Sequence, residues 1–335
     1  MKLPIPKKYR IPFITASTLL IIVLSALFHL FLATPSGSGK NVYLFDFGRG
    51  ESLKSIATAL EERKVIKSAG FFVLYARLHG DAGRLKAGYY QLSDALSPVE
   101  ILRRMVAGEV FVFRFTVPEG YSIYQIAELL SERRMFDKGV FLKECFNRSL
   151  LSELGIEGKS VEGYLYPSTY DIKPGISPAD VIRLMVKQFE KVYQKDFSGR
   201  APECGLSKRE VIILASMIEK EAMASVERPI IASVFHNRLQ RGMPLQSDPT
   251  AVYGVRAFAG SVTKEDICRN TPYNTYLIGG LPPGPIGNPG REAIEAVINP
   301  AKTDYLYFVA KKDGTHFFSR TLEEHNLAVR RFLKS

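Results

Sequence analysis

The stretch Ser207-Lys-Arg-Glu-Val-Ile-Ile-Leu-Ala-Ser-Met-Ile-Glu-Lys-Glu221 determines how the rest of the chain can be arranged. Ser207 can accept a hydrogen bond from the backbone of Glu210, whose carboxylate can reach back, and this capping box predicts a helix start. At 3.6 residues per turn, Glu221 falls within an apolar stripe and Glu219 falls on the opposite face. The stripe consists of Val211, Ile213, Leu214, Met217 and Ile218, and the opposite face carries Lys208, Arg209, Ser216 and Lys220. We therefore expect Glu221 to be shielded from water and Glu219 to be solvated.

A carboxyl group in the position expected for Glu221 should resist ionisation. Burial raises the pKa of such a group toward the neutral range in which it can donate a proton. Pro229 suits the first turn of a following helix, so Glu221 should lie near the C-terminal end of its own helix, where the dipole also disfavours a negative charge. A buried structural glutamate, paired with an arginine or a backbone amide, explains this helix equally well.

Longer motifs surround this helix and resemble those of one known family. They are Ser216-Met-Ile-Glu-Lys-Glu-Ala222, Ala232-Ser-Val-Phe-His-Asn-Arg-Leu239, Gly242-Met-Pro-Leu-Gln-Ser-Asp-Pro-Thr-Ala-Val-Tyr-Gly254, and the segments 162–170, 273–286 and 301–309. Together they resemble the bacterial endolytic murein transglycosylase (YceG-like) family, over nearly everything that follows the N-terminal apolar segment. The resemblance implies that the second glutamate of Glu-Lys-Glu, here Glu221, is the catalytic residue.

Polar and aromatic residues around these motifs are the candidates for binding a glycan. Tyrosine rings suit the flat apolar faces of sugars, and the segment 162–170 is dense in them, although it could equally be a packed turn. The polar loop 246–250 follows the expected pair of helices, and we expect it to line the glycan cleft. The candidate substrate-binding residues are Glu162, Tyr166, Ser225, Glu227, Asn237, Gln246, Ser247, Asp248, Thr250, Tyr253, Tyr273 and Asn274.

Composition narrows the classes of partner. The chain has 335 residues, with 45 Lys+Arg against 34 Asp+Glu and a formal net charge of +11. Such a balance suits nucleic acid, anionic lipid or an acidic wall polymer, but no nucleic-acid-binding motif is present. The three cysteines and five histidines show no metal-ligand spacing. We expect no metal and no cofactor.

The N-terminus predicts a membrane anchor. The basic residues Lys2, Lys7, Lys8 and Arg10 precede an uncharged run over 11–33, which is about 23 residues or roughly 35 Å as a helix. Basic residues before the run predict a cytoplasmic N-terminus and an extracytoplasmic remainder in the inner membrane. A cleaved signal peptide is the rival interpretation, but Phe31 would occupy a position where cleavage requires a small residue.

An internal repeat follows the anchor at a constant offset of 70 positions. Gly50-Glu-Ser-Leu-Lys-Ser-Ile-Ala57 matches Gly120-Tyr-Ser-Ile-Tyr-Gln-Ile-Ala127, and Phe71 and Phe141 keep the same offset. A strand, a capped helix and a second helix form the plan of a LysM-like carbohydrate-binding module. The alternative is an ordinary helix with a common cap pattern, and two copies in register argue against it.

These observations predict an α+β protein with a modular order. We expect a cytoplasmic tail at 1–10, a transmembrane helix at 11–33, a linker at 34–40, a LysM-like subdomain at 41–110 and a catalytic domain at 111–335. A second LysM-like repeat would occupy 111–145.

The resemblance implies a lytic transglycosylase that cuts nascent peptidoglycan internally, between N-acetylmuramic acid and N-acetylglucosamine. Its products would carry 1,6-anhydro ends, its cuts would limit strand length, and membrane-bound peptidoglycan synthases would be partners. Two alternatives remain. One is a muramidase-type hydrolase with Asp248 as second carboxylate, and the other is a non-catalytic wall-binding scaffold.

Overall fold

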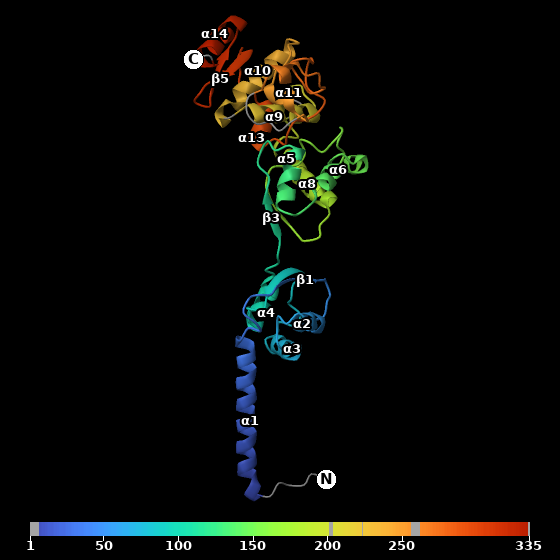
Figure 1. The fold of residues 1–335 in the computed structure, drawn as a ribbon, viewed down its shortest axis with the longest axis vertical. Helices are drawn as coiled ribbons and strands as arrows, with labels where there is room; N and C mark the ends of the chain where they lie inside the picture. The colour runs from blue at the N-terminus through green and yellow to red at the C-terminus, as the bar shows by residue number, and fades with distance from the viewer. Residues whose placement is uncertain (1–6, 201–203, 223, 256–261, 334–335) are drawn as a thin grey trace. The chain divides into compact units, whose positions relative to one another are not determined.

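The computed structural model describes residues 7–200, 204–222, 224–255 and 262–333. Within these ranges, side chains are described for residues 17–332. Residues 1–6 of the expected basic tail, including Lys2, lie outside the described residues. The chain forms two compact units, residues 1–113 and residues 114–335, which we call unit 1 and unit 2 (Figure 1). Helices and short two-stranded sheets occur in both, which confirms the mixed α+β class.

Unit 1 begins with a helix and continues with a small α/β module. Its elements are α1 (Lys7–Ala33), β1 (Val42–Phe47), α2 (Leu53–Glu62), α3 (Ala69–Leu78), β2 (Gly88–Ser93) and α4 (Pro98–Ala107). In the described part of the chain, no helix combines the length and the apolar character needed to cross a bilayer. Strands β1 and β2 pair antiparallel, with Phe45 opposite Tyr90. Alternation along β1 turns Phe45 and Phe47 into the core, where the apolar faces of α2, α3 and α4 cover them.

Unit 2 contains a first part that runs from β3 to α8. Its elements are β3 (Phe113–Thr116), α5 (Ile123–Glu132), α6 (Lys138–Cys145), α7 (Arg148–Glu153), β4 (Thr169–Ile172) and α8 (Pro178–Asp196). The strands β3 and β4 pair with each other. Side-chain hydrogen bonds join Arg114 to Asp171 and Thr116 to Thr169 across them.

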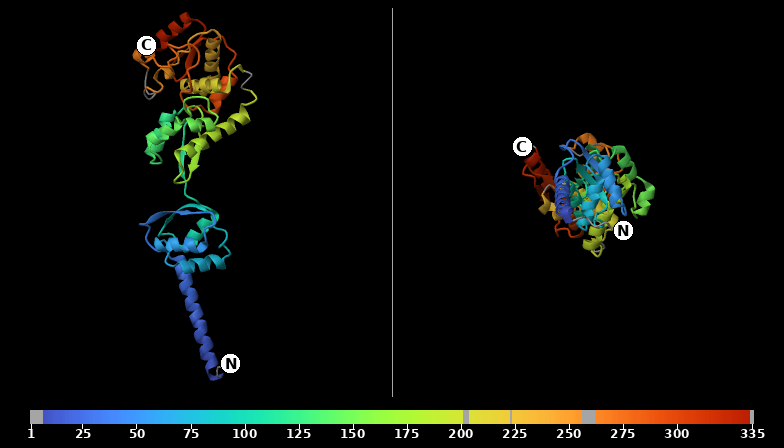
Figure 2. Two further views of the ribbon diagram at one scale, coloured as in Figure 1. Left: turned by 90° about the vertical axis from the view of Figure 1, so that its right-hand side faces the viewer. Right: turned by 90° about the horizontal axis from the view of Figure 1, so that it is seen from below.

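The second part of unit 2 is built around one buried helix, α9. Its elements are α9 (Lys208–Glu221), the 3-10 turn η2 (Ser225–Glu227), α10 (Arg228–Gln240), α11 (Asp248–Val252), α12 (Lys264–Cys268), α13 (Arg291–Ile298), β5 (Tyr307–Ala310), β6 (His316–Ser319) and α14 (Leu322–Leu333). Helices α10, α11 and α13 all pack against α9. The antiparallel hairpin β5–β6 carries α14. In two views, the yellow and orange helices of residues 208–253 lie together beside the green helices of residues 123–145 (Figures 1 and 2).

The internal repeat is visible in the backbone of both units. Helices α2 and α5 start after the side-chain caps Ser52 and Ser122, which are 70 positions apart. Gly50 and Gly120 both have positive φ, and so do Lys64 and Arg134 in the turns after the two helices. Non-glycine residues rarely adopt this conformation, so its recurrence at the same offset indicates one shared local fold.

The repeat extends further than the offset of 70 indicates. Ser97-Pro-Val-Glu-Ile-Leu-Arg-Arg-Met-Val106 caps and forms α4, and Ser177-Pro-Ala-Asp-Val-Ile-Arg-Leu-Met-Val186, now at an offset of 80, caps and forms α8. The hydroxyl groups of Tyr90 and Tyr170 each donate to the carbonyl four residues earlier. Both units therefore contain a β-α-α-β-α module, and the second copy has ten additional residues between Ser122, the cap of α5, and Tyr170 of β4.

One residue match of the expected repeat is wrong. Phe141 is fully buried on α6, whereas Phe71 on α3 is 45% exposed, and its neighbour Phe72 is buried instead. Phe71 packs edge-on against Phe28 and Phe31 of α1. The start of α3 is shifted by one residue relative to α6, because Ser68 caps α3 and Asp137 caps α6.

Candidate active site

Glu221 is the last residue of α9, as the sequence predicts, and its carboxyl group meets the start of α11. The capping box of Ser207 and Glu210 is present at the other end of the helix. The hydroxyl group of Ser247, the N-cap residue of α11, donates a hydrogen bond to Glu221 Oε1 over 2.5 Å. Two segments that are 26 residues apart in sequence are thus joined at this carboxyl group.

The surroundings of Glu221 favour its protonated form. Burial of the carboxyl group raises the pKa of Glu221 to about 7, and the negative charge of Asp248 contributes to this rise. The hydrogen bond from Ser247, a backbone hydrogen bond at Asp248 and the cation of Arg238 act in the opposite direction. Glu221 has no ion pair among the described residues. A carboxylic acid with these neighbours can hold a proton at neutral pH and release it to a bound substrate.

The expectation of a solvated Glu219 is wrong. The side chain of Glu219 is only 5% exposed, and it forms an ion pair with Arg228 at 2.8 Å. Its other oxygen accepts from the backbone N–H of Gly290. Helix α9 is covered on every side, since all residues from Val211 to Ile218 are buried. The two glutamates are therefore both shielded, but only Glu219 has a cation as its partner.

A network of hydroxyl groups fixes the position of Ser247. The Thr250 hydroxyl donates to the carbonyl of Ser247 over 2.6 Å, and the Ser247 N–H donates to Thr275 Oγ1 over 2.9 Å. The hydroxyl groups of Thr250 and Thr275 lie 2.8 Å apart. All three residues are buried, so the network has no competition from water and holds the start of α11 in one orientation.

The residue before Ser247 has an unusual backbone. Gln246 has φ +51°, a left-handed conformation that is uncommon outside glycine. Buried Arg238 on α10 stabilises this turn, since its Nη1 donates to the carbonyl of Leu245 and to Gln246 Oε1. Its Nε donates to the carbonyl of Leu306, which ties the turn to β5. Strained backbone of this kind is often found where side chains are held for function.

Asp248 lies beside the same site but has a different partner. The hydroxyl group of Tyr276 donates to Asp248 Oδ1 over 2.5 Å. Asp248 is partly exposed, and its charge raises the pKa of Glu221. This arrangement places a second carboxylate near Glu221.

Three further candidate residues form a separate cluster in unit 2. Glu162 is buried and accepts hydrogen bonds from the Ile123 N–H, the Tyr253 hydroxyl and the Asn288 amide. Burial raises the pKa of Glu162 to about 7. The Tyr253 and Tyr273 rings lie 4.7 Å apart between their centroids. Glu162 thus joins the start of α5 to the end of α11.

The remaining candidates lie outside these two clusters, and most are occupied by contacts within the protein. Glu227 holds His316 of β6 through both carboxylate oxygens. Asn237 donates to the carbonyls of residues 303 and 305, and Asn274 donates to those of 267 and 269. The carbonyl of Tyr166 accepts from Tyr170. Ser225 is exposed in η2.

Sequence reasoning missed the residues that support the site. Arg238, Thr275 and Tyr276 lie within the family-like motifs but were not singled out, because no local pattern shows which residue a side chain will meet. Lys220, expected on a solvated face, instead donates to Gln125 Oε1 of α5, and burial lowers the pKa of its ammonium group.

Comparisons with known proteins agree on one family. The YceG-like family model matches residues 45–331. A Bacillus subtilis protein named endolytic murein transglycosylase is 35% identical over 302 residues, covering 85% of this chain and 83% of that protein. A Streptococcus pneumoniae protein of the same name is 31% identical over 318 residues, which span 57% of its length.

A solved structure is similar to this chain and carries the same family name. The crystal structure of a yceG-like protein from Listeria monocytogenes superposes with a TM-score of 0.61 at 36% identity, covering 86% of this chain and 99% of that one. The sequence resemblance is thereby confirmed, and the chain belongs to the YceG-like family.

Proposed function

We propose that this protein is an endolytic lytic transglycosylase of peptidoglycan and that Glu221 is its catalytic acid. The relatives from Bacillus subtilis and Streptococcus pneumoniae carry the name endolytic murein transglycosylase. The observation that carries the assignment is the shielded Glu221 carboxyl, with its pKa raised to about 7 and with Ser247 holding one oxygen.

The reaction begins with proton transfer from Glu221. Because the Ser247 hydroxyl occupies Oε1, the proton of the neutral acid resides on Oε2, which is the oxygen able to donate. Oε2 protonates the oxygen between N-acetylmuramic acid and N-acetylglucosamine, and the bond from this oxygen to the muramoyl anomeric carbon breaks. Positive charge develops on the sugar as the carboxylate forms.

The second step closes the sugar ring on itself. The muramoyl C6 hydroxyl attacks the anomeric carbon and gives its proton to the Glu221 carboxylate, so that the acid is regenerated and no water is consumed. The product is a 1,6-anhydro end. A single carboxyl group serves as acid and then base, which requires a pKa near the working pH.

Asp248 supports one competing reaction. A muramidase-type hydrolase would use two carboxylates, and Asp248 is the second carboxylate beside Glu221. The Tyr276 hydroxyl bound to Asp248 Oδ1 favours a positioning role instead, since one of the two carboxylate oxygens is already occupied by a protein donor. A non-catalytic wall-binding scaffold, the other alternative, has no use for a shielded carboxylic acid at Glu221.

Cleavage inside nascent strands, before they are matured, would limit the length of glycan chains.

We also propose that residues 11–33 anchor the chain in the inner membrane with the N-terminus cytoplasmic and unit 2 extracytoplasmic. The uncharged run and its preceding basic cluster support the anchor, as do large apolar side chains of α1 that are more than half exposed, such as Leu19, Leu20 and Ile21. The β-α-α-β order of unit 1 supports a LysM-like module at 41–110, and membrane-bound peptidoglycan synthases fit as partners.

Mass spectrometry of peptidoglycan digests tests the proposed reaction. The wild type should release fragments with 1,6-anhydro ends, and Glu221→Gln should release none. Reducing ends from the wild type would instead establish a hydrolase, and Asp248→Asn would then be expected to abolish activity. If the wild type binds glycan but releases no fragments, the protein is a scaffold.

A further inference from the structure

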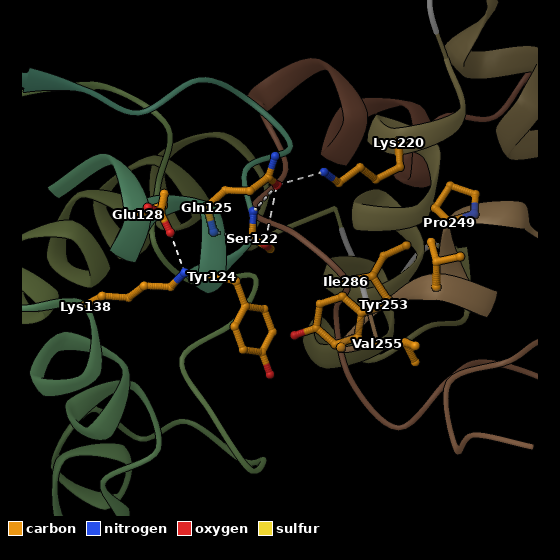
Figure 3. Close-up of a pocket in the computed structure, with 12 residues that line it drawn as sticks. Ser122, Tyr124, Gln125, Glu128, Lys138, Lys220, Pro249, Tyr253, Val255 and Ile286 are labelled. Carbon is orange, nitrogen blue, oxygen red and sulfur yellow. Dashed lines mark hydrogen bonds and ion pairs between the residues drawn. The ribbon is translucent and has the colours of Figure 1, made fainter. Parts of the chain in front are cut away.

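Unit 2 contains a cavity of about 360 Å³ beside the Glu221 site, which we call the α5–α11 cavity. One wall consists of residues of α5 and Lys138 of α6, and the other consists of Lys220, Ile286 and the segment 249–255 (Figure 3). Its volume lies within the range of roughly 300–1,000 Å³ that is usual for small-molecule sites.

Two residues of the cavity wall are sequence neighbours of the Glu221 site. Lys220 of its wall directly precedes Glu221 in α9. Pro249, also in its wall, follows Asp248 and the Ser247 that holds Glu221. The cavity wall therefore includes the residue next to Glu221 and a residue two positions from Ser247.

The lining combines aromatic rings, aliphatic groups and a few polar groups. The rings of Tyr124 and Tyr253 lie 6.1 Å apart between their centroids, one from each wall (Figure 3). Val255 adds an exposed aliphatic side chain. The Lys220 ammonium donates to Gln125 Oε1 over 3.3 Å, so both polar groups lie at one end of the lining.

This chemistry suits a neutral ligand with flat apolar faces. The second lysine of the lining, Lys138, is paired with Glu128 of the same wall, so its charge is already balanced. Tyrosine rings can stack on sugar faces, and aliphatic side chains can contact acetyl methyl groups. Lys220 and the Gln125 amide can bind hydroxyl and acetamido oxygens.

The internal repeat provides independent support for a binding face on α5. In unit 1, a groove is lined by Ser52, Lys54, Ser55 and Thr58. The residues 70 positions later, which are Ser122, Tyr124, Gln125 and Glu128, all line the α5–α11 cavity. Both copies of the module thus present the same helix face to an open space, but only the second copy has a tyrosine on it.

The additional residues of the second copy hold this face against α11. Glu162 lies in the stretch 146–168 between α6 and β4, which is longer than the corresponding stretch 79–87 of unit 1. Its carboxyl group accepts from the Ile123 N–H at the start of α5 and from the Tyr253 hydroxyl at the opposite wall. The two walls are therefore fixed relative to each other.

We propose that the α5–α11 cavity is a subsite for N-acetylated sugar residues of the glycan strand, with Tyr124 as its principal contact. This assignment rests on the proposed function, since it places the strand that Glu221 cleaves. The second copy of the β-α-α-β-α module thereby serves as the substrate-binding wall of the catalytic unit.

Binding of N-acetylchitotetraose to the full chain tests the subsite. The probe contains only N-acetylglucosamine, and the Glu221→Gln background prevents turnover, so calorimetry reports binding alone. In this background, Tyr124→Ala should weaken binding at least tenfold, and Val255→Asp on the opposite wall should weaken it as well. Phe146→Ala, which removes an exposed aromatic ring of unit 2 outside the cavity lining, should change the affinity less than twofold. Tyr124 is 38% exposed, so its replacement leaves the core intact, which a thermal melt verifies.

The outcomes separate the subsite from the proposed function. Equal affinity of the Tyr124→Ala and parent proteins overturns the subsite, even if wild-type digests contain anhydro ends. Binding of a free stem peptide in place of the sugar, lost in Tyr124→Ala, would also overturn it, because the cavity would then be a peptide site. Tyr124-dependent sugar binding without any cleavage by the wild type would leave the subsite standing and refute the transglycosylase.

Discussion

The hydroxyl group of Ser247 donates to Glu221 Oε1 over 2.5 Å, and this contact joins the end of α9 to the start of α11. This hydrogen bond has two effects, one on the orientation of the Glu221 carboxyl group and one on its pKa. The hydrogen bond orients the carboxyl group, which benefits proton transfer, and it lowers a pKa that burial has raised to about 7. Removing it should therefore change both the rate and its dependence on pH.

Ser247→Ala should lower kcat by up to about a hundredfold, because a catalytic group that is no longer held loses its productive orientation. Without the hydrogen bond, the pKa of Glu221 rises further, and the alkaline limb of the pH–rate profile should move to higher pH. Rates of anhydro-end formation between pH 5 and pH 9 measure both effects. Ser152→Ala on α7, an exposed serine outside the candidate site, is the control and should match the wild type. A limb that moves to lower pH would show that Ser247 does not donate to Glu221.

Glu221→Gln should stabilise the protein at alkaline pH. The carboxyl group has a pKa of about 7 in the folded chain against 4.5 as the unperturbed value, so the folded state binds its proton more tightly. Wild-type stability therefore falls as pH rises from 4.5 to 7, by about 3 kcal/mol at most, and then levels off. A glutamine has no charge to bury and does not suffer this loss.

Thermal melting at two pH values checks this effect. The Tm of Glu221→Gln should exceed that of the wild type at pH 8 and should equal it at pH 4. A control is Glu153→Gln, since Glu153 is exposed and its pKa is lowered by Arg183. That variant should not gain stability at pH 8. An equal Tm of Glu221→Gln and wild type at pH 8 would contradict the raised pKa.

The helix face pattern indicated the environment of Glu221 correctly but not that of Glu219. Periodicity identifies a face that is apolar, and the stripe around Glu221 was strong enough to predict its burial. It does not show whether the other face is also covered. Here α10, α11 and α13 surround α9, and buried Ser216 accepts from the Ile286 N–H on the face expected to be solvated. Burial of that face depends in part on partners that are 70 or more residues away, such as Ile286 and Gly290.

The internal repeat also could be predicted from the sequence only in part. The offset of 70 located the caps Ser52 and Ser122 and the buried faces of α2 and α5. The later half of the module was not recognised, because ten additional residues change the offset to 80 before Tyr170. Those residues contain Glu162, whose contacts with Ile123 and Tyr253 join distant segments and leave no local signal.

Arg228→Gln should destabilise unit 2 by about 3–5 kcal/mol, because it leaves the Glu219 carboxylate buried without its cation. The two side chains are 11% and 5% exposed. The double variant Glu219→Gln, Arg228→Gln should recover part of this loss. Arg291→Gln is the control, since Arg291 is 54% exposed in its pair with Asp196 and its replacement should cost much less stability. Denaturant unfolding of the three variants provides the comparison. Equal losses for Arg228→Gln and Arg291→Gln would show that the Glu219 pair is not buried.

Gly163→Ala should destabilise unit 2 and loosen the wall that Glu162 holds. Gly163 has φ +87°, and a Cβ atom there would lie 2.5 Å from Pro285 Cγ and 2.8 Å from Ile212 Cγ2. Gly155 provides a matched control, because its φ is +64° but its Cβ would meet nothing within 4 Å. Both alanine variants should lose about 1–2 kcal/mol of unfolding free energy, because a non-glycine residue is unfavourable in this left-handed backbone conformation. Only Gly163→Ala adds a clash, which typically costs about 1–3 kcal/mol more. The difference in unfolding free energy between the two variants isolates the contacts with Pro285 and Ile212. A difference near zero would mean that these two residues can move away from Gly163.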